Sequence, residues 1–175
     1  MGYVIRLAKE SEIPALPEIE RSAAQRFLPY LATLNIPVDL LEGLTTPRFL
    51  QAAQADRRLW VAVEREQPVG FIVAKFLTKI CFVVELDVHL DYGRRGIGSA
   101  LVEACCHGAQ QRGYDQIMLT TFRAVPWNIP FYQRLGFEVM PAADWPLEIS
   151  AIVQHEARYG FAQAKRAVMR RSIRP

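Results

Sequence analysis

Glycines and arginines gather just before a helical pattern, in the segment YGRRGIGSALVEACCHGAQQRGY. Glycine at Gly93, Gly96 and Gly98 lets the backbone adopt positive φ angles and approach a ligand closely. The first amides of a helix have no partner within the helix, and the helix dipole is positive at that end. The neighbouring guanidinium groups of Arg94 and Arg95 suit a pyrophosphate. These residues predict a phosphate-binding site at the start of a helix.

Two other phosphate-binding motifs fit this segment poorly. A P-loop requires glycine, lysine and then serine or threonine, a combination that the chain lacks. A dinucleotide fingerprint that begins at Gly96 would need glycine or alanine at position 101, which is Leu101. The preceding pattern, VVELDVHL, alternates apolar and polar residues, whereas a buried parallel strand is almost entirely apolar. An enzyme that binds a dinucleotide or another phosphate ligand is therefore the weaker alternative.

Two carboxylates lie on that strand pattern. Glu85 and Asp87 are two positions apart, so their side chains point to the same side of a strand, and His89 follows on that side. Carboxylates are uncommon within a strand of a central sheet unless the face that they share is exposed to solvent or has a function. They can act there as a general base, and an exposed polar face of the sheet is the structural alternative.

Hydrophobic periodicity predicts the elements that carry these residues. Three consecutive strand patterns with short connections predict an antiparallel meander before the glycine-rich segment. The strand, helix and strand over 79–122 predict one parallel crossover. We expect strands over 3–8, 58–66, 67–77, 79–90, 115–122, 137–142 and 164–173, and helices over 9–27, 47–55, 98–113, 127–135 and 151–160.

The overall composition bounds the kind of protein. The chain has 175 residues, 51% hydrophobic and 22% charged, which predicts a single domain over 1–175. Its net charge of +3 is too small to indicate nucleic-acid binding. No apolar stretch reaches the ~20 residues that cross a bilayer, and the first residues do not form a signal peptide. We therefore expect no membrane contact and a cytoplasmic location.

Three cysteines, Cys81, Cys105 and Cys106, have no disulfide-framework spacing. Their pattern favours free thiols in a reducing compartment. No pair of cysteines or histidines has the spacing of zinc ligands, so we expect no metal.

Two motifs resemble those of a known family. The segment VELDVHLDYGRRGIGSALVEA resembles the acyl-CoA-binding motif of the GNAT family of N-acetyltransferases, and PFYQRLGFEV, Pro130–Val139, resembles the helix and strand that follow it. The motifs are separated as in the family, and the meander precedes them, so the resemblance is specific over Leu59–Val139. It implies an α/β (α+β) fold with a mixed, mostly antiparallel central sheet flanked by helices.

The resemblance implies that acetyl-CoA binds at the glycine-rich segment. In the family, backbone amides of this segment hold the pyrophosphate, and the preceding strand pairs with the pantetheine arm like an added strand. That strand and its parallel neighbour splay apart to admit the arm. The matching residues are Leu86, Asp87, Val88, Arg94, Arg95, Gly96, Ile97, Gly98, Ser99 and Ala100, with Asn128 and Phe131 from the second motif.

Two positions depart from the family's pattern. The family usually has glutamine or arginine three residues before the first motif glycine, where this chain has Gly93, and we expect the adjacent Arg94 to serve instead. The family often has asparagine seven residues before the tyrosine, where this chain has Val125. We expect Asn128 nearby to cap its helix, with contact to the cofactor as the alternative.

The resemblance also implies the chemistry. Tyr132 matches the tyrosine that the family uses as general acid on the departing sulfur. The family does not fix the base, and we expect Glu85, with Asp87 and His89 behind it. The implied activity is transfer of an acetyl group from acetyl-CoA to a primary amine of a small molecule or peptide by direct attack. A non-catalytic acyl-CoA-binding module is the alternative.

The acceptor is expected to contact the N-terminal helices and the C-terminal segment. Four apolar or aromatic residues would suit a small amine, and a packed core explains them equally well: Phe27, Tyr30, Leu34 and Trp127. We also consider a homodimer in which the C-terminal segments exchange strands.

Overall fold

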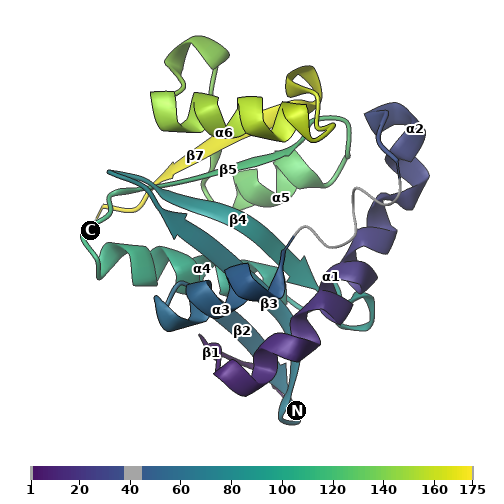
Figure 1. Ribbon diagram of the computed structural model, residues 1–175, viewed down its shortest axis with the longest axis vertical. Coiled ribbons are helices and arrows are strands. Elements are labelled where there is room, and N and C mark those ends of the chain that lie inside the picture. The colour runs from purple at the N-terminus through teal and green to yellow at the C-terminus, as the bar shows by residue number, and fades with distance from the viewer. Residues whose placement is uncertain (1, 38–44, 175) are drawn as a thin grey trace.

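The computed structural model describes residues 2–37 and 45–174, and its elements follow the predicted order (Figure 1). The strands are β1 Val4–Leu7, β2 Leu59–Glu64, β3 Gln67–Phe76, β4 Cys81–Val88, β5 Gln116–Phe122, β6 Glu138–Val139 and β7 Arg166–Ser172. The α-helices are α1 Leu16–Ala24, α2 Leu31–Leu34, α3 Pro47–Ala55, α4 Ile97–Gln110, α5 Asn128–Arg134 and α6 Leu147–Arg158. The long helix predicted over 9–27 is divided into a 3-10 segment at Glu10–Ala15, then α1, then a 3-10 segment at Gln25–Tyr30.

The strands form one mixed sheet in the order β1-β2-β3-β4-β5-β7-β6. Strands β4 and β5 are parallel, and the other paired strands are antiparallel. This confirms the predicted fold class and the crossover from β4 through α4 to β5. The final strand, β7, lies between β5 and β6 and pairs with β5 along its whole length.

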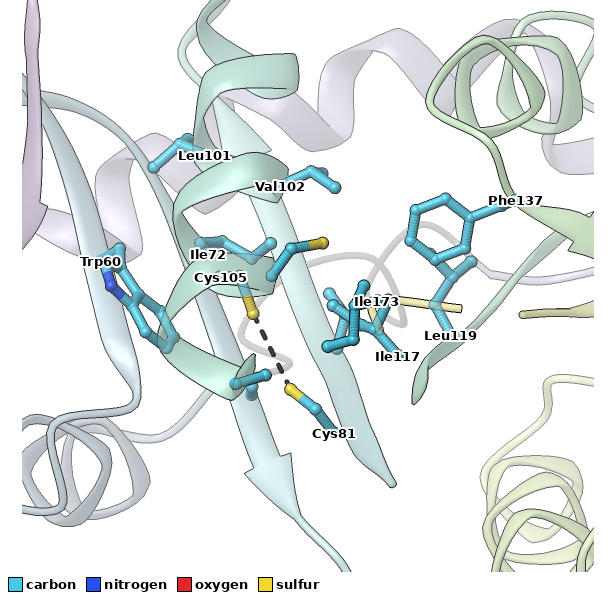
Figure 2. Packing of buried hydrophobic residues seen from close by; sticks show 14 of the residues in the cluster. Trp60, Ile72, Cys81, Leu101, Val102, Cys105, Ile117, Leu119, Phe137 and Ile173 are labelled. Carbon is cyan, nitrogen blue, oxygen red and sulfur yellow. Dashed lines mark hydrogen bonds between the residues drawn. The ribbon is translucent and has the colours of Figure 1, made fainter. Parts of the chain in front are cut away.

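Helices cover both faces of the sheet. On one face, Leu101 and Cys105 of α4 belong to the same core as Trp60 and Ile72 of the meander (Figure 2). On the opposite face, α1 and α3 pack against the alternate residues of the same strands, including Phe71 and Val73. The period-two alternation of each strand thus supplies two separate cores.

The cysteines lie in the core beneath α4. All three are free thiols, as predicted, and the structure shows that all three are also buried. The Sγ atoms of Cys81 on β4 and Cys105 on α4 are 3.9 Å apart (Figure 2). A hydrogen bond with Cys81, together with burial, raises the pKa of the Cys105 thiol and keeps it protonated.

A bulge in β4 determines which way its polar residues point. Ala74 of β3 pairs with Val83, and the preceding residue Val73 pairs with Glu85, so Val84 is an extra residue in β4. Residues directly opposite one another in antiparallel strands point to the same face. Glu85 therefore shares the face of Val73, which α1 and α3 cover.

Strands β4 and β5 pair only at one end. Cys81–Val83 pair with Ile117–Leu119. No further residue pairs between β4 and β5 occur within the described residues. Figure 1 shows the strands diverging beyond this point, with α5 close to β5 on the open side. This is the splay that the family resemblance implied.

Candidate active site

Three carboxylates meet on the α1 face of β4. Asp87 pairs with Phe71, whose side chain lies in the core beneath α1 and α3, so Asp87 shares a face with Glu85 as predicted. Glu20 of α1 interacts electrostatically with both residues. Asp87 is 7% exposed and Glu20 is 3% exposed. The packing of α1 therefore adds to the pair a third carboxylate that the sequence pattern did not indicate.

Burial alters the titration of both β4 carboxyl groups. Burial, and then the negative charge of Glu20, raises the pKa of Glu85 to about 8. Burial and the charge of Glu85 likewise raise the pKa of Asp87 well above its usual range. Since the two groups interact, they titrate as a pair. A carboxyl group whose pKa approaches that of an amine is well matched to accept its proton.

One oxygen of this cluster has no partner. Asp87 Oδ2 is buried without a hydrogen bond within the described residues. Glu20, by contrast, accepts hydrogen bonds from the hydroxyl and from the backbone N–H of Thr45, the latter at 3.2 Å. Buried polar atoms in proteins are rarely left unsatisfied, so the Asp87 oxygen can accept a hydrogen bond from a further donor.

Tyr132 lies on α5, the helix beside the open gap. Its ring packs edge-on against Phe131, with centroids 4.9 Å apart, and against Phe137, with centroids 5.6 Å apart. Burial, and then the charges of Glu85 and Asp87, raises the pKa of the phenol, which therefore stays protonated at neutral pH. The predicted acid and the predicted base are thus electrostatically linked.

The N-terminus of α4 presents free donors. Gly96 precedes the helix with a φ angle of 79°, and no side chain caps the helix there. The N–H of Ala100 donates to the carbonyl of Gly96 at 3.0 Å. The earlier amides of Ile97, Gly98 and Ser99 lack partners within the helix, an arrangement that suits an anion.

The three glycines around the start of α4 differ in backbone conformation and in what surrounds them. The predicted positive φ angle is wrong for Gly93, which has φ of −63°, and for Gly98, which is the second residue of α4. Arg94 has a positive φ angle of 59°. A β-carbon at Gly98 would lie 3.4 Å from the ring of Phe131 and 3.9 Å from Val88. The start of α4, the end of β4 and α5 therefore meet at this glycine.

The two arginines of the segment have different surroundings. Arg95 donates hydrogen bonds of 2.5 and 3.2 Å to Glu64 of β2, and its guanidinium lies over the ring of Tyr92. Arg94 is exposed and has no hydrogen bond or ion pair with the part of the chain that the structure describes. The side chain of Arg95 is engaged within the protein, which leaves Arg94 as the freer charge.

The start of α5 also differs from expectation. Helix α5 is preceded by Trp127, and no side chain caps it, so the capping role predicted for Asn128 is wrong. Asn128 is 9% exposed. Val125 is 1% exposed in an apolar cluster with Leu34 and Phe122. At this position, where the family often has asparagine, Val125 therefore contributes to the packing of the core.

His89 lies beyond the end of β4. The strand ends at Val88, and the Nδ1 atom of His89 accepts a hydrogen bond from the N–H of Asp91. Its ring packs edge-on against Tyr92. The side-chain hydrogen bond and ring contact of His89 are therefore with the segment that follows β4, and not with Glu85 or Asp87.

Arg26, in the 3-10 segment after α1, approaches the site although no sequence signal pointed to it. Its guanidinium lies against Gly93, where a β-carbon would collide with it. Its charge also interacts with Asp87. It has no hydrogen bond or ion pair to other parts of the chain within residues 2–37 and 45–174. The site therefore includes the long side chain of Arg26, whose guanidinium group is positively charged and forms no ion pair within the described residues.

A polar cluster from α6, β5 and β7 borders the carboxylates. Arg166 donates to Glu156 Oε2 at 3.0 Å and to the hydroxyl of Thr120 at 2.7 Å, and its guanidinium lies over the ring of Phe122. Arg166 also interacts electrostatically with Glu85. This cluster, like Glu20 and Arg26, depends on contacts between distant segments.

The aromatic residues expected on the acceptor side pack against one another. The ring of Trp127 has its centroid 5.9 Å from that of Phe27 and 5.1 Å from that of Tyr30. Leu34 is 1% exposed in the same cluster. The packed core that was the alternative explanation is therefore present.

No group of histidine, cysteine, aspartate and glutamate residues within 2–37 and 45–174 is arranged to hold a metal ion. Across the same ranges, no helix combines the length and apolar character that a bilayer crossing requires.

Comparisons with known proteins agree with this geometry. The model of the Acetyltransferase (GNAT) family matches residues 25–137. Over 85 residues, the chain is 31% identical to N-acetyltransferase family 8 member 3 of Mus musculus, covering 45% of this chain and 38% of that protein. Over 149 residues, it is 28% identical to the amino-acid acetyltransferase of Pasteurella multocida (strain Pm70), covering 81% of this chain and 28% of that protein. The chain thus matches well under half the length of these curated relatives.

Two solved structures show the same fold. The PaiA N-acetyltransferase from Thermoplasma acidophilum in complex with coenzyme A has a TM-score of 0.73 at 16% identity, covering 98% of this chain and 99% of that chain. N-acetylglutamate synthase from Neisseria gonorrhoeae, complexed with coenzyme A and N-acetyl-glutamate, has a TM-score of 0.71 at 14% identity, covering 100% of this chain and 36% of that chain.

Proposed function

The chain belongs to the Acetyltransferase (GNAT) family, and we propose that it transfers an acetyl group from acetyl-CoA to a primary amine of a small molecule or peptide by direct attack. The observation that carries the proposal is the placement of Tyr132 on α5, beside the opening between β4 and β5, together with Glu85 and Asp87 on one face of β4. The charges of Glu85 and Asp87 also raise the pKa of the Tyr132 phenol. A protonated phenol and a carboxyl pair of raised pKa supply an acid and a base at one place.

The gap and the start of α4 fit coenzyme A. The backbone around Leu86 and Val88, where β4 has parted from β5, suits the pantetheine arm as an added strand. The uncapped amides of α4 suit the pyrophosphate, and Arg94 and Arg26 add positive charge beside them. Phe131 lies next to both segments. The coenzyme A present in similar solved structures supports this choice of carrier.

Acetyl-CoA supplies an activated acetyl thioester, and the residues of the chain move the protons. Glu85, with its pKa near 8, accepts a proton from the attacking nitrogen. Tyr132 donates its proton to the departing sulfur and is restored from solvent. A backbone N–H beside the bulge of β4 is suited to stabilise the oxyanion, since the ladder with β5 has ended there.

Calorimetric titration tests the cofactor first. Acetyl-CoA and coenzyme A are expected to bind, and NADH and ATP are the comparators. A panel of primary amines with detection of released thiol then tests transfer. Binding of acetyl-CoA without turnover of any amine would favour the non-catalytic acyl-CoA-binding module, and binding of NADH without coenzyme A would favour the dinucleotide alternative.

A further inference from the structure

The surroundings of Asp87 are predominantly acidic. The charged groups that interact with it are Glu85 on its own strand, Glu20 on α1 and Arg26 in the segment after α1. Three carboxyl groups therefore face one guanidinium group. The region is buried, where charges interact more strongly than they do in water.

Two charged residues that interact with Glu85 already have partners. Glu20 accepts two hydrogen bonds from one threonine, and Arg166, near Glu85, is paired with Glu156. Arg26 interacts with Asp87 through its charge but makes no hydrogen bond to it within the described residues. Asp87 Oδ2 is a buried oxygen that has no donor among the residues that the structure describes.

A primary ammonium group has the chemistry that is missing. It carries one positive charge and three N–H donors, so it can bond to Asp87 Oδ2 and favour ionisation of the carboxyl groups around it. A carboxylate on the adjacent carbon would instead bring a negative charge into a buried region in which negative charge is already disfavoured, as the raised pKa values of Glu85 and Asp87 show. The cation that interacts with Asp87, Arg26, lies against Gly93, toward the phosphate-binding end of the site.

We propose that Asp87 binds the ammonium group of the acceptor, and that the acceptor is a primary amine without a carboxylate on the carbon that bears the nitrogen. This proposal rests on the proposed acetyl transfer. The chemistry is that of a peptide N-terminus or an alkylamine, and not that of a free α-amino acid. Glu85, two residues earlier on the same face, is then placed to take the proton from the bound nitrogen.

Three matched amines test the acceptor class. L-Alaninamide, isopropylamine and L-alanine share a carbon that bears a methyl group and an amine, and they differ only in whether the next group is an amide, a methyl or a carboxylate. Each is titrated by calorimetry into the wild-type protein saturated with coenzyme A, which has no acetyl group to transfer. We expect the two amines without a carboxylate to bind about tenfold or more tightly than alanine. Of those two, tighter binding of alaninamide indicates a peptide end, and tighter binding of isopropylamine indicates an alkylamine.

The variant Asp87→Asn tests the residue. It keeps the shape of the side chain and removes its charge, so the preference for alaninamide over alanine should fall toward unity. Asp115→Asn is the matched control, because Asp115 is paired with Arg174 at an exposed position. Since each amine is compared between variants, differences in amine basicity cancel.

Each outcome bears on the inference separately from the proposed function. Equal binding of alanine and alaninamide to the wild-type protein would overturn the acceptor class, and an unchanged preference in Asp87→Asn would overturn the role of Asp87. The wild-type comparison needs no variant, so it decides the acceptor class even where Asp87→Asn does not fold. If coenzyme A and amines bind but no amine is acetylated from acetyl-CoA, the proposed function fails while the binding result stands.

Discussion

The guanidinium group of Arg26 occupies the space that a β-carbon at Gly93 would fill. The backbone of Gly93 has φ of −63°, which any residue adopts, so glycine is needed here for room and not for its conformational freedom. Arg26 thereby brings a positive charge, from a segment remote in sequence, to the loop that leads into the uncapped start of α4. The positive charge of Arg94 and Arg95, in the glycine-rich segment itself, is thus supplemented by the charge of Arg26 from another part of the chain.

This relationship predicts an exchange of arginines. Arg26→Ala should weaken coenzyme A binding about tenfold or more, because a charge-assisted hydrogen bond to phosphate is worth about 1.5–3 kcal/mol. Gly93→Arg alone should also weaken binding, because its side chain collides with Arg26. The double variant should recover affinity. Calorimetry with coenzyme A measures these effects, and pantetheine, which has no phosphate, should bind all variants equally.

Arg48→Ala is the matched control, since Arg48 is an exposed arginine on α3. Wild-type affinity of Arg26→Ala for coenzyme A, or an equal loss toward pantetheine, would show that Arg26 does not contact phosphate.

The two glycines at the start of α4 should respond differently to alanine. Gly96 has φ of 79°, a conformation that costs other residues about 1–2 kcal/mol, so Gly96→Ala should lower the Tm by several degrees and weaken coenzyme A binding. Gly98 is helical, and a β-carbon there makes an ordinary contact with Phe131, so Gly98→Ala should raise stability by up to about 1 kcal/mol. Thermal unfolding of both variants measures this, and equal losses of Tm would contradict it.

Periodic elements could be predicted from the sequence. Helix α3 has the predicted bounds, because Pro47 at its start and an apolar face are local signals. The strand predicted over 137–142 is only Glu138–Val139, since β7 supplies just two paired positions for it. The position of β7 between β5 and β6 depends on pairing between segments far apart in the sequence, and no local sequence pattern indicates such pairing.

The sequence predicts only those site residues that lie close to one another along the chain. Glu85 and Asp87 share a face because of strand geometry, and the donors of α4 follow from its glycines. Glu20 and Arg26 reach the site only through the packing of α1 and the following segment over β4. A single sequence contains no signal for such contacts between segments.

Tyr132→Phe should separate catalysis from binding. The substitution keeps the ring contacts with Phe131 and Phe137 and removes only the hydroxyl that the proposal uses as acid. We expect kcat to fall on the order of 100-fold or more, as for loss of a general acid, with little change in the Kd for coenzyme A. Steady-state kinetics and calorimetry measure the two quantities. Unchanged kcat would remove Tyr132 from the mechanism, and a matching loss of affinity would indicate a structural role.

Glu85→Gln should change both activity and the pH dependence of stability. If Glu85 is the base, wild-type kcat/KM should rise with pH up to about 8, where the carboxyl group ionises, and the variant should lose about 100-fold or more of it. For stability, the folded-state pKa is raised above the unfolded value, so the folded protein holds this proton more tightly than the unfolded chain does. The stabilisation is full at pH below the unfolded pKa of 4.5 and is lost as the pH rises toward 8. Glutamine does not titrate, so the Tm of Glu85→Gln relative to wild type should increase between pH 5 and pH 8.5.

Glu138→Gln is the control for this measurement, because Glu138 is exposed on β6 and its Tm difference from wild type should stay constant with pH. A Tm difference for Glu85→Gln that is also constant across this range would show that Glu85 ionises near its ordinary pKa. In that case the carboxyl group would be charged at neutral pH whether or not an amine is bound, and the match between base and amine on which the proposed proton transfer depends would be lost.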